Sequence, residues 1–172
     1  NDTKTLEKAA KAGLEKFPDD EILKRFEVIA LLKSGTIETA VQKARLLSET
    51  NPKLPDHLLY AETQLKAADY PGAVETLKKA YALSFDNATA ERIALVMYAH
   101  LGEKKEAIQF LKDHIGTHGN SVIVGKRLGN FYSDSGALDE AALMYERTHD
   151  EFADAACAEE ALKIYHYKQD FP

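Results

Sequence analysis

Residues 128–145 read Leu-Gly-Asn-Phe-Tyr-Ser-Asp-Ser-Gly-Ala-Leu-Asp-Glu-Ala-Ala-Leu-Met-Tyr, and this stretch decides the fold. Gly136 separates two segments, so the pattern predicts a helix, a short turn and a second helix that packs back on the first. Small residues at Gly129 and Ala141 would let the two helix backbones approach closely. Tyr132 and Tyr145 are expected to fill the space beside them.

The same pattern recurs along the chain. Ala107 lies 34 residues before Ala141, Ala73 lies 34 residues before Ala107, and Ala40 lies 33 residues before Ala73. The helix-ending glycines Gly35, Gly102 and Gly136 keep the same register. The order Leu-Gly, Tyr, Ala and aromatic resembles the tetratricopeptide repeat, although Gly125 stands where that family has Trp. The resemblance implies an all-α, right-handed superhelical solenoid of antiparallel helix pairs, with the first helix of each pair on the concave side.

The recurring markers predict one array over residues 1–172. A single helix pair cannot bury its apolar face alone, so the pairs are expected to stack. Both ends of the sequence fall within a repeat, and we therefore expect an internal slice of a longer array or a stable core left by trimming. The expected parts are a half repeat at 1–18, full repeats at 21–53, 54–87, 88–121 and 122–154, and a half repeat at 155–172.

Local signals set the expected helix boundaries in the first repeats. Asp19-Asp20 precedes a helix, where acidic residues are favourable, and Gly35 suits the left-handed turn that ends it. The apolar residues expected on the packed side of this helix are Ile22, Phe26, Ile29, Ala30 and Leu32. Asn51-Pro52 closes the repeat, and Pro71 suits the first turn of a later helix.

Composition excludes several classes of protein. The chain has 28 acidic against 22 basic residues, which argues against a nucleic-acid backbone as ligand. No run of eighteen apolar residues is present, so no membrane insertion is expected. Cys157 is the one cysteine, which excludes an intrachain disulfide. Degenerate repeats of this kind point to a soluble bacterial protein of the cytoplasm or periplasm.

No catalytic motif is present, and an enzyme is not expected. The sequence has no phosphate-binding glycine loop, no zinc-protease motif and no nucleophile elbow. His114 and His118 have the spacing of a metal pair but no third ligand, and are interpreted as exposed loop histidines. Cys157 is interpreted as a small packed residue. We expect no catalytic residue, cofactor or metal. The recurring tyrosines are interpreted as core.

The positions that face the groove in the resembling family define the candidate binding residues. Among them Arg25, Arg92 and Lys126 would form a basic track, with Lys33 and Lys66 beside it. Such a track suits an extended or helical peptide that carries carboxylates and apolar anchors. The alternative is that these are solvated basic residues, some of them paired within their own helices. The full set is Arg25, Ile29, Lys33, Leu58, Glu62, Lys66, Arg92, Val96, His100, Lys126 and Asn130.

A narrower arrangement in the same family clamps a terminal carboxylate with Lys and Asn. Lys126 and Asn130 match the first pair of such a clamp. The next helix offers Glu160 or Ala161 where a second Asn is needed, which argues against the clamp.

The sequence thus predicts a non-catalytic protein-interaction scaffold that holds a partner segment in its concave groove, and the basic track favours an acidic segment. Two alternatives stay open. One is homo-oligomerisation through the exposed repeat ends, for example Leu162 and Tyr165. The other is a regulatory repeat domain of a larger protein.

Overall fold

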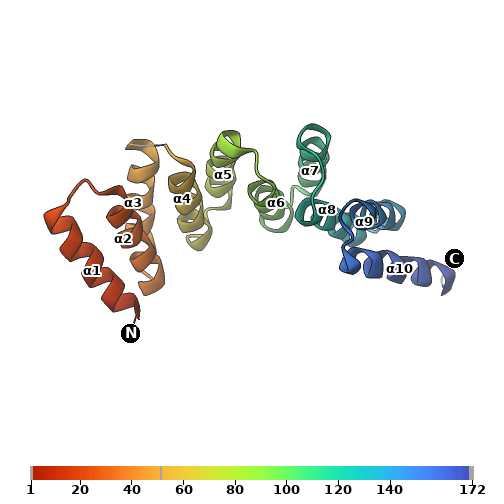
Figure 1. The fold of residues 1–172 in the computed structure, drawn as a ribbon, viewed down its shortest axis with the longest axis horizontal. Coiled ribbons are helices and arrows are strands. Elements are labelled where there is room, and N and C mark those ends of the chain that lie inside the picture. Colours follow the sequence, from red (N-terminus) through yellow and green to blue (C-terminus); the bar gives the residue numbers. More distant parts are fainter. Residues whose placement is uncertain (1, 51, 171–172) are drawn as a thin grey trace. The chain divides into compact units, whose positions relative to one another are not determined.

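The computed structural model describes residues 2–50 and 52–170, and within them every regular element is helical (Figure 1). Contacts divide the chain into two compact units, Asn1–Ser84 and Phe85–Pro172. Unit 1 contains α1 (Asp2–Lys16), α2 (Glu21–Ser34), α3 (Ile37–Thr50), α4 (Leu54–Lys66) and α5 (Tyr70–Ser84). Unit 2 contains α6 (Asn87–Val96), the π-helical segment η1 (Met97–Leu101), α7 (Lys104–His118), α8 (Val122–Asp134), α9 (Leu138–Phe152) and α10 (Ala155–Asp170). The predicted all-α fold of repeated, antiparallel helix pairs is confirmed.

Short polar and glycine signals set the helix ends in unit 1. The Asp20 carboxylate accepts hydrogen bonds from the backbone N–H groups of Ile22 and Leu23, both at 2.9 Å, and so caps α2. Gly35 ends α2 with φ +82°, as its position predicts. Pro71 lies in the first turn of α5, where the proline nitrogen has no hydrogen bond to lose. The predicted end of the first full repeat at Asn51-Pro52 includes Asn51, and the half repeat expected at 155–172 includes Phe171 and Pro172; these three residues lie outside the described residues.

The core of unit 1 is small and depends on close approach of α2 and α3. Val28, Ala40 and Ala44 are fully buried, and Leu59 and Tyr60 of α4 pack against them. Two residues expected in this core are not there. Ile22 is 59 % exposed and Phe26 is 43 % exposed, because the helix turns them away from the side that carries Val28 and Leu31.

The stretch at 128–145 brings α8 and α9 into close contact. A Cβ on Gly129 would lie 2.6 to 2.9 Å from three ring atoms of Tyr145, so the ring lies directly against the α8 backbone. Tyr145 is 3 % exposed and Ala141 is fully buried, while Tyr132 packs at the edge of the same cluster. Gly125 is equally confined, since an added Cβ would lie 2.1 Å from Oγ1 of Thr148. The predicted close approach at Gly129 and Ala141 is confirmed.

Aromatic stacking joins the π-helical segment to α8. The rings of Tyr98 and Phe131 stack at 4.0 Å, and the Tyr98 hydroxyl donates to the Phe131 carbonyl oxygen at 3.4 Å. The π turn ends at Gly102, and it carries Met97 and Tyr98 into the core.

Two sequence interpretations of chemically reactive residues have different outcomes. His114 is not an exposed loop residue: it is 2 % exposed in α7 and its Nε2 lies 2.7 Å from Oδ1 of Asn87. His114 is buried because α7 continues as far as His118 and carries His114 onto its packed face. Cys157 is fully buried, as expected, and burial raises the pKa of its thiol to about 11.

Among the described residues no cluster of three His, Cys, Asp or Glu side chains could hold a metal. No helix in the same ranges has the length and apolar character needed to cross a bilayer.

Candidate functional site

An apolar stripe lies on the solvent side of α2. Ile22, Phe26 and Ile29 recur at intervals of four and three residues, so they share one face of the helix, and Lys33 continues that face by one turn. Ile22 and Phe26 are largely exposed and Ile29 is half-buried. Large apolar side chains on one exposed face are typical of a surface that binds another molecule.

The exposed side of α4 continues this surface. Leu59 of α4 packs on the core shared with α2, and Leu58, Glu62 and Lys66 lie on the adjacent side of α4. Leu58 is half-buried, whereas Glu62 and Lys66 are exposed. We call the surface formed by Ile22, Phe26, Ile29, Lys33, Leu58, Glu62 and Lys66 the α2–α4 face.

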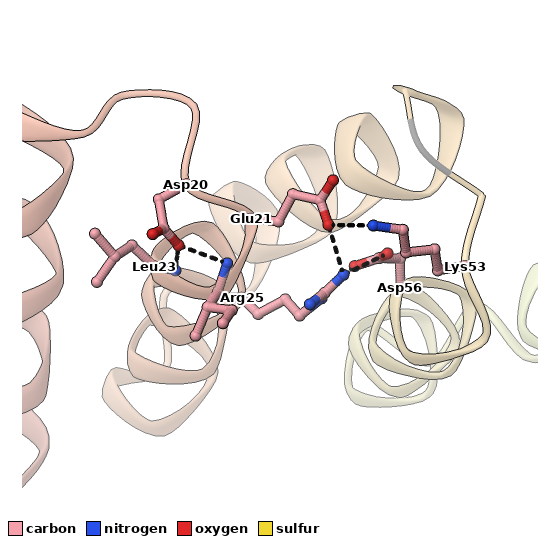
Figure 2. Close-up of polar contacts among 7 residues, drawn as sticks. Asp20, Glu21, Leu23, Arg25, Lys53 and Asp56 are labelled. Carbon is pink, nitrogen blue, oxygen red and sulfur yellow. Dashed lines mark hydrogen bonds and ion pairs between the residues drawn. The ribbon is translucent and has the colours of Figure 1, made fainter.

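Arg25 joins α2 to α4 (Figure 2). Its Nε donates to Oδ1 of Asp56 at 2.6 Å and its Nη2 donates to Oδ2 at 2.9 Å. Glu21 accepts from Nη2 at 3.2 Å and also from Nζ of Lys53 at 2.7 Å. The hydrogen bond to Asp56 raises the pKa of the Arg25 guanidinium, and Asp56 itself is 1 % exposed. The positive charge of Arg25 is therefore balanced by carboxylates of unit 1.

In unit 2, the residues expected at the groove on α6 and η1 differ in exposure. Val96 is 4 % exposed and belongs to the core, since the helix turns it to the same side as Ile93. It is therefore not available to a partner in this conformation. Arg92 is half-buried and His100 is exposed.

Lys126 and Asn130 lie near α9 and the start of α10. The hydrogen bond from the Cys157 backbone N–H lowers the pKa of Asp154, and the nearby positive charge of Lys126 adds a smaller lowering. The Tyr145 hydroxyl donates to Oδ1 of Asn130 at 2.6 Å. Burial raises the pKa of Tyr145 to about 12, and the negative charge of Glu160 adds to this.

These surroundings disfavour a terminal-carboxylate clamp. Ala161 is in the core and Glu160 brings a carboxylate to the region, so an incoming carboxylate would meet a like charge.

A second inter-helix ion pair lies in unit 2. Arg127 of α8 donates to Glu91 of α6, and both side chains are partly buried. Each unit thus has an arginine of one helix bound to a carboxylate of the equivalent helix in the neighbouring pair. The partners are 31 residues apart for Arg25 and 36 residues apart for Arg127.

The sequence interpretation did not include Ile22 and Phe26 among the candidate binding residues because it assigned them to the core. A signal was present: α2 carries two apolar stripes, one with Val28 and Leu31 and one with Ile22, Phe26 and Ile29. A helix that packs against neighbours on one side needs only the first of these.

Two hollows lie elsewhere on the units, between helices of successive pairs. The larger, of about 610 Å³, is lined by α1, α2, α3 and Asp56 of α4, and it includes Leu14, Leu46 and the ion pair of Lys43 with Glu27 at 2.9 Å. The smaller, of about 320 Å³, is lined by α7, α8 and α9 and includes Ile115, Leu128 and Leu143. Residues in these hollows can serve as control positions when binding to the α2–α4 face is tested.

The sequence matches no protein-family model and no curated protein. The structure is similar to several solved structures. A thermophilic tetratricopeptide repeat protein of Thermus thermophilus is 20 % identical, with 91 % of this chain and 86 % of that chain covered and a TM-score of 0.60. MamA is 17 % identical over 99 % of this chain and 86 % of that chain, with a TM-score of 0.68. YrrB, described as a tetratricopeptide repeat protein with an unusual peptide-binding site, is 18 % identical over 95 % and 85 %, with a TM-score of 0.64. At these identities the likeness concerns the fold, and the chain has the fold of the tetratricopeptide repeat proteins.

Proposed function

We propose that this protein is a non-catalytic interaction scaffold and that the α2–α4 face binds a segment of a partner protein. The observation that carries the proposal is the exposed apolar stripe on α2. Ile22 and Phe26 expose 59 % and 43 % of their surface beside half-buried Ile29. Their positions are not needed for the core of unit 1, which is formed by the opposite side of the helix.

The fold supports this proposal by analogy. Arrays of helix pairs expose extended surfaces suited to binding polypeptides. The similar protein YrrB is described as having a peptide-binding site, which makes a peptide ligand reasonable here as well. The proposed site retains Ile29, Lys33, Leu58, Glu62 and Lys66 from the sequence prediction and adds Ile22 and Phe26. Arg25 acts as a structural link rather than as a ligand contact.

A comparison of two serine variants tests the proposal. Phe26→Ser removes the centre of the α2–α4 face, whereas Leu46→Ser removes a leucine that is 65 % exposed on α3 and lies outside that face. Both proteins should keep wild-type helicity and unfolding midpoint, because neither side chain belongs to the core. Partners captured from a lysate and identified by mass spectrometry should be lost with Phe26→Ser and kept with Leu46→Ser. Equal loss or equal retention in the two variants would reject the α2–α4 face as the site.

A second candidate function is self-association through α10. Leu162 is 63 % exposed and Tyr165 is 38 % exposed on this helix. If α10 forms a contact between copies, the solution mass from light scattering should exceed 19.1 kDa and should return to that value in a Leu162→Ser variant. A mass of one chain at all accessible concentrations would reject this function.

A further inference from the structure

We infer that the α2–α4 face takes a partner segment in the form of an amphipathic helix with a carboxylate group at the end that lies next to Lys33 and Lys66. This inference rests on the proposed function and specifies the class of partner. It follows from the shape of the apolar stripe, the hydrogen-bonding capacity of the face and the placement of its charges.

The apolar part of the face has the length of a short helix. Ile22 and Ile29 are seven residues apart in α2, which corresponds to about 10 Å along the helix axis. Lys33 lies about 6 Å further along the same face. A ligand helix of three turns, with apolar residues at i, i+3 or i+4, and i+7, would cover this distance.

The chemistry of the face favours a helix over an extended strand. Ile22, Phe26, Ile29 and Leu58 have no side-chain hydrogen-bonding group, so the centre of the face cannot pair with a ligand backbone. An extended peptide would bring unpaired backbone N–H and C=O groups against these residues, which is unfavourable. A helix satisfies its own backbone and can present apolar side chains alone.

The charges of the face place the carboxylate at one end. Arg25 is bound to Asp56 and Glu21, so it is already neutralised by its own chain. Lys33 and Lys66 are exposed and occupy the last turns of α2 and α4. Glu62 lies one turn before Lys66 on the same side of α4, and repels a ligand carboxylate near the middle of the face. An acidic residue is therefore best accommodated beside Lys33 and Lys66.

Peptide display tests the inference without knowledge of the natural partner. A library of random 16-residue peptides is selected on the full chain and depleted on the Phe26→Ser variant. Enriched peptides are then synthesised, and their affinity is measured by fluorescence anisotropy. We expect apolar residues at helical spacing, acidic residues at one end, and an increase of helical circular dichroism on binding. Phe26→Ser should weaken binding by about tenfold or more, as for a central contact residue.

The charge contribution is tested with two double variants of equal charge change. Lys33→Glu with Lys66→Glu should weaken binding several-fold and reduce its dependence on salt concentration, because screened ion pairs are removed. Lys8→Glu with Lys105→Glu changes exposed lysines on α1 and α7 and should leave affinity unchanged. Equal effects of the two double variants would overturn the assignment of the carboxylate to Lys33 and Lys66.

The possible outcomes separate the inference from the function on which it rests. Peptides that require Phe26 but lack helical periodicity, for example proline-rich sequences, would overturn the helix and keep the α2–α4 face as a binding surface. Failure to enrich any peptide that distinguishes wild type from Phe26→Ser would overturn both. Peptides recovered before the depletion step that bind Phe26→Ser as tightly as wild type, and that lose affinity with Leu46→Ser or Leu143→Ser, would overturn both as well and would locate binding in one of the two hollows.

Discussion

The contact between Gly129 and Tyr145 predicts opposite effects for the same substitution at two glycines. Gly129→Ala places a Cβ 2.6 Å from the nearest Tyr145 ring atom, whereas ordinary contact begins near 3.4 Å. The ring would have to move by roughly 0.8 Å, and Tyr145 is 3 % exposed and hydrogen-bonded to Asn130. Gly116→Ala in α7 places a Cβ in open space. The first substitution should therefore strain unit 2, and the second should not.

The magnitudes follow from two opposing contributions. Replacing glycine by alanine inside a helix stabilises a protein by about 0.5–1 kcal/mol, and this gain applies to both positions. Overpacking a filled core costs about 1–3 kcal/mol, and this cost applies at position 129 alone. Gly116→Ala should raise the free energy of unfolding by about 0.5–1 kcal/mol. Gly129→Ala should be less stable than Gly116→Ala by about 1–3 kcal/mol.

Urea unfolding followed by far-UV circular dichroism measures both variants against the wild type. Near-UV circular dichroism of the tyrosines gives an independent report on the Tyr145 ring, and it should change in Gly129→Ala but not in Gly116→Ala. If Gly129→Ala is as stable as Gly116→Ala, then Tyr145 does not pack against the α8 backbone. The close helix contact inferred from the sequence would then be refuted.

Three further perturbations test the polar interactions. Asp56→Asn removes the buried charge that pairs with Arg25. Because Arg25 is partly exposed, this variant should destabilise unit 1 by about 1–3 kcal/mol in urea unfolding. Glu49→Gln is the control: it breaks the exposed Arg45–Glu49 pair and should cost less than about 0.5 kcal/mol. Burial lowers the pKa of His114 below its ordinary value, so the folded protein favours the neutral imidazole. The resulting stabilisation is present above a pH of about 6.5 and should be lost as the pH falls toward the lowered pKa of the folded state. Unfolding midpoints at pH 7.5 and 5 measure this loss, which should be smaller in His114→Gln; equal losses would contradict a neutral, buried His114. Burial also raises the pKa of Cys157 to about 11, so a thiol reagent at pH 8 should label it slowly in the native protein and rapidly in urea, and fast native labelling would show that the thiol is accessible.

The candidate site shows where sequence reasoning reaches its limit. The register of the repeats assigned Lys33, Glu62 and Lys66 to the groove, and their side chains are exposed. It assigned Arg25 to a partner because a basic residue at a groove position is equally compatible with a ligand and with an internal carboxylate. Asp56, which decides between the two, lies 31 residues away on another helix.

The sequence by itself determined the helix pairs and the close contact between them. Its information is local: Gly35 ends a helix, and Gly129 and Ala141 leave room for a neighbouring backbone. Such signals depend on residues within a few turns, and they recur with the repeat.

The tertiary structure alone decided which side of each helix is free. Ile22 and Phe26 are as apolar as the core residues Val28 and Leu31, and they became surface residues because α3 and α4 pack on the other side of α2. Hydrophobicity requires that some apolar surface be buried but does not specify which of two stripes it is. That choice, like the pairing of Arg25 with Asp56, depends on contacts between residues distant in sequence.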